Sequence, residues 1–200
     1  MATTANVEKK SEKPGLPPRE RILTAAADLF YRHGIRAIGV EAIAEAAGTN
    51  KMTLYRHFAS KDELVAECLR RLAKKADGRW DRLAADHPGD PRAQLHAWLE
   101  MAAGCIADPE DRGCALANAA VELPEKDHPA RRVVEKLKSA QRERLVALCR
   151  AAELSQPELL ADQLFLLFEG ARVCRQSIGP EGPGCRFVRM SEALIAAHTA

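Results

Sequence analysis

Residues 51 to 61 gather side chains that can bind phosphate. Lys51, Arg56 and Lys61 are cationic, and Thr53 lies among them with a hydroxyl and a methyl group. Cations and hydroxyls donate hydrogen bonds to phosphate oxygens, and a methyl group can contact the thymine methyl in a DNA groove. Ordinary solvated charge is the alternative interpretation for Lys51 and Arg56. The local structure decides between them, because only an outward helical face would present these side chains to DNA.

A helical period organises the sequence before this cluster. Apolar residues from Ile22 to Phe30 recur at steps of three and four, and this first helix is predicted to end at Gly34. A second, shorter helix is predicted over residues 40–47, with Gly48 as its C-terminal cap.

The cluster itself falls on a third predicted helix, residues 51–58. Asn50 is a candidate N-cap, and Leu54 and Phe58 share one apolar face, so we expect these two to be core residues without a contact role. Two short helices around a tight turn, braced by a longer one, form a helix-turn-helix whose second helix enters the major groove.

The rest of the chain is also predicted to be helical. Ser60 and Glu63 have capping-box spacing, so a fourth helix begins at Lys61 and runs toward Arg82. Further helical patterns cover residues 95–106, 116–123, the segment after Pro129, the segment after Pro157, and a last stretch to about residue 197.

Several short motifs between about residues 20 and 65 occur together. They are Ala42-Ile43-Ala44, Ala47-Gly48, Leu54-Tyr55-Arg56-His57-Phe58 and Ser60-Lys61-Asp62-Glu63-Leu64, with Phe30 and Gly34 before them. Together they resemble the signature of the TetR family of transcriptional repressors. The resemblance covers a third of the chain.

The resemblance implies a cytoplasmic homodimer that binds double-stranded operator DNA. It also implies that the affinity for this DNA falls when a small-molecule inducer binds the C-terminal domain. It also assigns Tyr55 and His57 to backbone phosphates. Met52 stands where a small residue is usual, so it either touches a thymine methyl or restricts approach to the groove. Ile38 and Gly39 stand where the family often has hydroxyl residues. The full predicted DNA-contact set is Arg36, Asn50, Lys51, Met52, Thr53, Tyr55, Arg56, His57 and Lys61.

Composition and charge limit the possible classes of protein. The 200 residues are 46% apolar, 29% charged and 4% aromatic, which favours an all-α globular fold. Residues 1–75 carry 14 Lys and Arg against 9 Asp and Glu, whereas the remainder has more acidic than basic residues. The N-terminal part of the chain is therefore the basic one. The longest apolar run, Leu164 to Phe168, is far too short to cross a bilayer, and residues 1–13 do not resemble a secretory signal.

No chemistry of a common enzyme class is visible in the sequence. The motifs GxSxG, HExxH, GxxxxGK[ST] and GxGxxG are absent, and the six cysteines form no CxxC pair. We therefore expect no catalytic residues, no metal, no cofactor and a reducing, cytoplasmic location. Two other functions are weighed against a ligand-responsive repressor: a ligand-independent DNA binder, whose C-terminal core would lack a cavity, and an all-helical enzyme.

A ligand pocket is predicted in the second half. Cys114, Asn118 and Glu122 share one helical face, and residues 113–118 with Glu122 resemble a stretch near the inducer pocket of some family members. Surface positions for Asn118 and Glu122 and a core position for Trp98 are the alternative. The predicted set from neighbouring helices is Trp98, His96, Arg172 and Gln176.

These expectations divide the chain into three parts: a disordered tail (1–18), a helix-turn-helix domain (19–65) and a ligand-binding and dimerisation domain (66–200), with the fourth helix as the relay. The run from Leu164 to Phe168 cannot face a single core, because consecutive residues are 100° apart on a helix. We therefore expect a dimer interface on this helix and the last one. The residues predicted at its centre are Phe187, Met190 and Leu194.

Two cysteines offer a different signal. Cys114 follows Gly113 at a predicted helix start, where the helix dipole favours a reactive thiolate, and Cys105 lies nine residues earlier. Together they are candidates for sensing an oxidant or an electrophile. The alternative is that they are small apolar core residues.

Overall fold

The fold is built from helices throughout the part of the chain that can be described. The computed structural model describes residues 15–199, in which it has nine α-helices, one short 3₁₀ helix and no strand. The predicted all-α class is confirmed. Most of the predicted tail, residues 1–18, lies outside the described residues, and Pro18 already belongs to the first helix.

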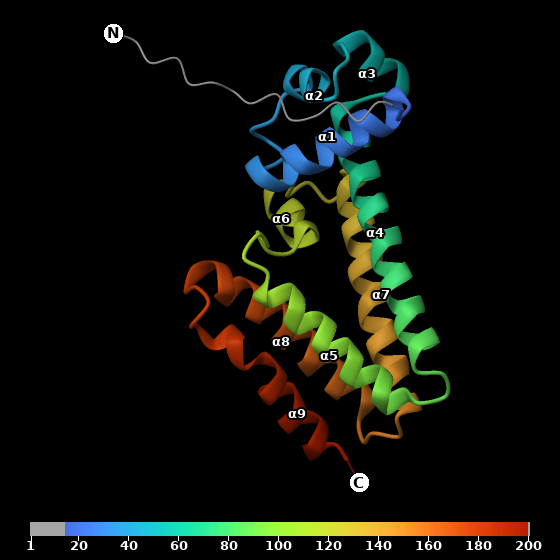
Figure 1. The fold of residues 1–200 in the computed structure, drawn as a ribbon, viewed down its shortest axis with the longest axis vertical. Coiled ribbons are helices and arrows are strands. Elements are labelled where there is room, and N and C mark those ends of the chain that lie inside the picture. Colours follow the sequence, from blue (N-terminus) through green and yellow to red (C-terminus); the bar gives the residue numbers. More distant parts are fainter. Residues whose placement is uncertain (1–14, 200) are drawn as a thin grey trace.

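The helix-turn-helix forms one end of the elongated molecule (Figure 1). Its helices are α1 (Pro18–His33), α2 (Val40–Ala46) and α3 (Lys51–His57). Gly48 follows α2 with a φ of +60°, which a residue without a Cβ adopts readily. Its N–H donates to the Glu45 carbonyl, and the Thr49 N–H donates to the Ala44 carbonyl, both at 2.9 Å. This is the hydrogen-bond pattern of a Schellman motif, so the predicted cap is confirmed.

Side-chain caps fix where the next two helices begin. The Asn50 side chain accepts a hydrogen bond from the Thr53 N–H at 2.9 Å, and Ser60 Oγ accepts one from the Glu63 N–H at 3.1 Å. Both predicted caps are confirmed. Ser60 starts α4 (Lys61–Asp86), whose 26 residues span about 39 Å and connect the two ends of the molecule.

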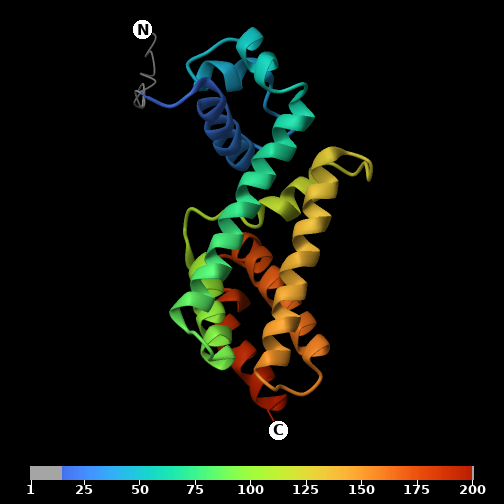
Figure 2. The same ribbon diagram turned by 90° about the vertical axis from the view of Figure 1, so that its right-hand side faces the viewer.

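The remaining helices form a bundle that reaches the C-terminus. They are α5 (Pro91–Ala107), α6 (Ala115–Glu122), α7 (Pro129–Ala151), α8 (Pro157–Ser177), the 3₁₀ helix η1 (Pro183–Arg186) and α9 (Phe187–Ala197). Helix α7 runs beside α4 and also packs on α8, which packs on α9 (Figures 1 and 2). Within residues 15–199, no helix has the length and apolarity to cross a membrane.

Two buried apolar clusters hold the helices together, and the upper cluster combines residues from both halves of the chain. The upper cluster contains the helix-turn-helix core and the first turns of α4, but also Leu116 and Ala119 from α6, Leu123 just after it, and Val134 from α7. The lower cluster joins α5, α8 and α9 to the C-terminal half of α7. The core of the helix-turn-helix is therefore completed by residues that lie far downstream in sequence.

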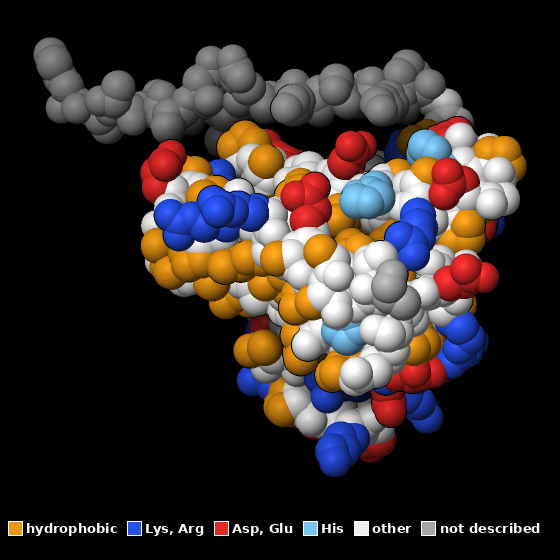
Figure 3. Space-filling model, turned by 90° about the horizontal axis from the view of Figure 1, so that it is seen from below, with side chains coloured by type: hydrophobic (Ala, Val, Ile, Leu, Met, Phe, Trp, Pro, Cys, Tyr) orange, Lys and Arg blue, Asp and Glu red, His pale blue; other side chains and the backbone are white. Residues whose placement is uncertain are grey.

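Phe187 corrects one prediction about the dimer interface. Its side chain is 2% exposed and packs against Trp98 and Phe168, so it belongs to the core of a single chain. Leu166 and Val173 on α8 are 70% and 61% exposed, as the argument from the apolar run requires. The molecule seen from the end where α9 finishes has apolar side chains gathered along one side (Figure 3).

The Ser60 cap gives a stability prediction. Ser60→Ala leaves the Glu63 N–H without its acceptor, so we expect the free energy of unfolding to fall by about 1 kcal/mol. Urea unfolding followed by circular dichroism at fixed protein concentration measures this change. The matched control is Ser177→Ala, because that exposed hydroxyl only donates to the Val173 carbonyl within α8, and its effect should stay within about 0.5 kcal/mol. Equal midpoints for the two variants would contradict the capping role.

Candidate functional site

Helix α3 separates its core side chains from its polar ones. Leu54 is fully buried, and Phe58 just after the helix is 3% exposed, so the prediction that both are core residues is confirmed. Around them the outward positions carry the predicted contact residues. Exposed members of that set are Asn50, Lys51, Met52, Tyr55, Arg56 and His57, whereas Thr53 and Lys61 are half-buried.

Some of these side chains already have partners in the free chain. The Lys51 Nζ lies 2.6 Å from Glu41 Oε1 on α2, and this hydrogen bond raises the pKa of Lys51 and lowers the pKa of Glu41. The Asn50 side-chain oxygen already accepts a hydrogen bond from the Thr53 N–H as the N-cap of α3. The Lys61 ammonium lies 5.9 Å from the centre of the Phe30 ring. Any DNA contact by Lys51 therefore competes with an internal ion pair.

Arg36 is placed apart from the set on α3. It lies in the segment between α1 and α2, where its backbone N–H donates to Glu122 Oε2 at 3.0 Å and its guanidinium lies 3.7 Å from Glu125. Gly34, just before it, has a φ of +86°, and a Cβ there would lie 3.0 Å from Glu122. Arg36 thus connects the helix-turn-helix to α6, and it remains a prediction as a DNA contact.

A cavity of about 1050 Å³ lies between the helix-turn-helix and the C-terminal helices. Six of the seven predicted ligand residues are in its wall: Trp98, Cys114, Asn118, Glu122, Arg172 and Gln176. His96, proposed with them, is exposed and is not part of the lining. Trp98 is 4% exposed and stacks on Trp80, and it also lines the cavity. It is therefore both a core residue and a pocket residue. The chain has two tryptophans, and both line the cavity.

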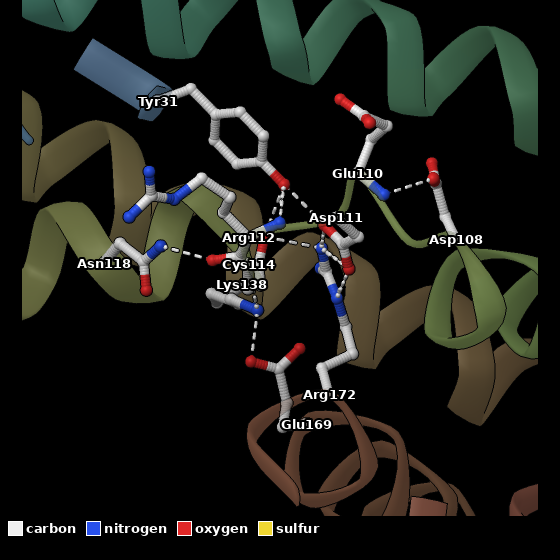
Figure 4. Close-up of polar contacts among 11 residues, drawn as sticks. Tyr31, Asp108, Glu110, Asp111, Arg112, Cys114, Asn118, Lys138, Glu169 and Arg172 are labelled. Carbon is white, nitrogen blue, oxygen red and sulfur yellow. Dashed lines mark hydrogen bonds and ion pairs between the residues drawn. The ribbon is translucent and has the colours of Figure 1, made fainter. Parts of the chain in front are cut away.

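One end of the cavity carries a half-buried ion pair between α8 and the α5–α6 segment (residues 108–114). Arg172 binds Asp111 with two nitrogens, Nε at 3.1 Å from Oδ2 and Nη2 at 2.8 Å from Oδ1, and Nη2 also donates to the Gly113 carbonyl at 2.6 Å (Figure 4). Burial lowers the pKa of Arg172, but the hydrogen bonds and charge of Asp111 raise it overall. Arg172 therefore stays cationic.

Tyr31 of α1 is attached to this ion pair. Its hydroxyl donates to Asp111 Oδ1 at 2.5 Å and accepts from the Arg112 N–H at 2.7 Å (Figure 4). Burial and the hydrogen bond to Asp111 raise the pKa of Tyr31 to about 12, so the phenol keeps its proton. The Arg112 guanidinium also donates to the Arg32 carbonyl. The α5–α6 segment thus holds the end of α1 at two points.

A second ion pair lies near the first. Lys138 Nζ of α7 is 2.6 Å from Glu169 Oε2 of α8 and 3.1 Å from Cys114 Sγ (Figure 4). The sequence analysis missed Tyr31, Asp111, Lys138 and Glu169, because they come from four separate elements and no local spacing joins them. A search for opposite charges three or four residues apart on one helix would not have found these residues either.

Comparison with known proteins gives consistent results. The family model for bacterial regulatory proteins of the tetR family matches residues 22–68. A TetR transcriptional regulator from Streptomyces avermitilis is 34% identical in sequence, with a TM-score of 0.79 over 92% of this chain and 98% of its own.

Two more relatives extend the similarity. A TetR-family regulator from Streptomyces coelicolor is 26% identical, with a TM-score of 0.84 over 92% of this chain and 96% of its own. The HTH-type transcriptional regulator YjdC of Escherichia coli is 26% identical over 76% of this chain and 80% of that protein. The chain therefore belongs to the TetR family, and it is a DNA-binding transcriptional regulator and not an enzyme.

Proposed function

We propose that this chain is a repressor that binds operator DNA as a homodimer through α3 and leaves the DNA when a small molecule occupies the cavity. One observation carries the proposal: Ala27, Phe30 and Tyr31 of α1 line the cavity, and α1 packs on both α2 and α3. A molecule in the cavity would lie directly against the helix-turn-helix. A DNA binder without a ligand response needs no such cavity, so this feature disfavours the ligand-independent alternative.

DNA binding would use the polar face of α3 in the major groove, which is about 12 Å wide. The exposed cations and ring donors of that face reach phosphates and base edges, while Leu54 and Phe58 anchor the helix to the core. In a two-fold dimer the two α3 helices would read half-sites about one helical turn apart, roughly 34–36 Å. The operator is therefore expected to be palindromic.

Ligand release would be a shift between two populations of the dimer. A ligand that prefers a conformation with misspaced α3 helices draws the dimer from DNA, by no more than its difference in affinity for the two states. Helix α4 was the relay expected from sequence. The contacts of Glu122 with Arg36 and of Arg112 with Arg32 add a second connection to the helix-turn-helix.

Dimerisation would use the exposed side of α8. Leu159, Leu166 and Val173 are seven residues apart, so they form one stripe along this helix, and Met190 on α9 is 41% exposed. A stripe of this kind is stabilised when a second copy covers it. The interface then uses these residues and leaves Phe187 in the core.

The DNA proposal predicts unequal effects of two cation substitutions. Arg56 has no ion-pair partner among the described residues, so Arg56→Ala should weaken operator binding by roughly 10- to 100-fold. Lys51→Ala should weaken it less, because Lys51 must first leave Glu41. For the same reason Glu41→Gln should strengthen binding. Fluorescence anisotropy with an operator selected from random duplexes measures the affinities, and each lost phosphate contact should reduce the salt slope by about 0.9.

Lys136→Ala is the matched control, because this exposed lysine lies on α7. It should leave operator affinity unchanged. A triple alanine variant of Lys51, Tyr55 and His57 that binds as well as the wild type would refute the assignment of α3.

The dimer proposal predicts dissociation without unfolding. Leu166→Glu combined with Val173→Glu places two charges on the stripe, so we expect the dimer dissociation constant to rise by roughly 100-fold or more. Sedimentation velocity at micromolar concentration should then detect monomers with unchanged circular dichroism. Leu16→Glu is the control, because Leu16 is also an exposed apolar residue but precedes α1. A wild-type protein that is already monomeric at this concentration would contradict the proposal.

Modification of Cys114 is the alternative signal, and its contact with Lys138 is the observation in its favour, since a nearby cation stabilises a thiolate. Burial raises the pKa of Cys68 to about 12 and of Cys149 to about 11, so those thiols stay protonated. A reversible ligand predicts that wild type and Cys114→Ser keep the same operator affinity after mild peroxide treatment. Cys185→Ser, at an exposed cysteine, is the control. Peroxide release that only Cys114→Ser abolishes would replace the reversible ligand by a covalent signal.

A further inference from the structure

We infer that the cavity takes an amphipathic anion, with an aromatic body and a carboxylate or sulfonate group, whose anionic group binds Arg172 in place of Asp111 and thereby frees Tyr31 of α1. The inference rests on the proposed ligand response and names the class of ligand. It also identifies the contact through which that ligand acts.

Arg172 is the anion-binding group. Its side chain is 16% exposed, and the hydrogen bonds to Asp111 and Gly113 use only Nε and Nη2. The third nitrogen, Nη1, has no acceptor among residues 15–199, and it is not one of the enclosed polar atoms that lack partners. It therefore keeps accessible surface, and Arg172 is a residue of the cavity wall. A guanidinium matches a carboxylate in a two-point geometry, so a ligand anion can take over the position of Asp111.

Aromatic side chains continue from Arg172 into the cavity. The Arg172 guanidinium lies 5.7 Å from the centre of the Phe168 ring, and Phe168 packs edge-on against Trp98 at 5.8 Å. Trp98 in turn stacks on Trp80 at 6.4 Å. A planar ligand can pack along these rings only if its charged group lies at the Arg172 end. This arrangement selects a molecule with one anionic end and an aromatic remainder.

Five acidic residues lie in the cavity wall, and each is engaged within the chain. Asp28 is paired with Arg32 at 2.8 Å, Asp108 accepts from the Glu110 N–H at 2.9 Å, and Glu122 accepts from the Arg36 N–H at 3.0 Å. Glu169 is paired with Lys138 through Oε2 at 2.6 Å. Asp111 is already shared between Arg172 and Tyr31. Lys138 and Arg172 lie on the helices α7 and α8, whereas Asp111 lies in the α5–α6 segment between helices. The acid is therefore the member of the pair that can move.

Displacement of Asp111 would act on the helix-turn-helix directly. A carboxylate that is 12% exposed and has lost its guanidinium partner is an uncompensated buried charge, which is strongly unfavourable. Asp111 would turn toward water and take its segment along. Tyr31 would then lose its acceptor, and the adjacent Arg112 would loosen its bond to the Arg32 carbonyl. Both points that hold the end of α1 depend on this segment.

The test uses two probes with the same ring system, anilinonaphthalene sulfonate and the uncharged N-phenylnaphthylamine. Titration of the full-length dimer, followed by probe fluorescence and by quenching of Trp80 and Trp98, gives both affinities. We expect the wild type to prefer the sulfonate by about tenfold or more. Arg172→Gln should abolish this preference and leave binding of the neutral probe unchanged. Arg175→Gln removes the same charge one turn away on α8, outside the cavity wall, and should keep the preference.

Asp111→Asn provides the opposite test if Arg172→Gln fails to fold. A neutral amide competes less well for Arg172, so the sulfonate should bind several-fold more tightly and the neutral probe equally well. Equal binding of the two probes by the wild type, or a preference that survives Arg172→Gln, would overturn the inference. Operator release by both probes alike would also overturn it, yet would leave the proposed ligand response standing.

Tyr31→Phe tests the transmission step. Without the phenol hydroxyl, Asp111 is held less firmly on Arg172, so the sulfonate should bind more tightly while the ligand-free dimer binds its operator more weakly. Both changes would follow from a shift of the dimer toward the conformation in which Asp111 has left Arg172. If Tyr31 had only a structural role, the substitution would weaken binding of both the sulfonate and the operator. Unchanged operator and probe affinities, or weaker binding of both, would refute the role of Tyr31.

Discussion

The apolar contact between α6 and the helix-turn-helix is the constraint on which the rest of the structure depends. Leu116, Ala119 and Leu123 are buried in the same cluster as the core of α1, α2 and α3. Helix α3 and its neighbours therefore share their core with downstream residues. The cluster buries apolar area from α1 to α4 together with residues of α6 and α7, and this burial stabilises the position of α3.

A second consequence of this contact is the cavity. The space between the upper and lower clusters is lined by members of both, among them Phe30 and Leu116 of the upper cluster and Trp98 and Leu145 of the lower one. Most buried polar groups find partners, and here Arg172 pairs with Asp111 and Lys138 with Glu169 across elements, while Glu169 Oε1 has no partner among the described residues. The network fills part of the wall and also connects the two clusters.

The proposed ligand response would use the difference between this network and the apolar core. Ion pairs between separate elements contribute modestly to stability, because the loss of hydration offsets much of their attraction. They are, however, sensitive to any charge that enters the cavity, whereas the apolar contacts are not. The α5–α6 segment combines both properties, since Asp111 and Arg112 reach α1 while the flanking α6 packs in the core.

Sequence alone predicted the helix-turn-helix, the caps at Gly48, Asn50 and Ser60, and the outward face of α3. These features depend on local hydrogen bonds and on residues three or four apart, which the chain order records directly. Only the tertiary structure decided that Arg36 meets α6, that Phe187 is core, and which residues surround Arg172. Those outcomes depend on contacts between residues up to 89 positions apart, and side-chain spacing along one helix carries no information about them.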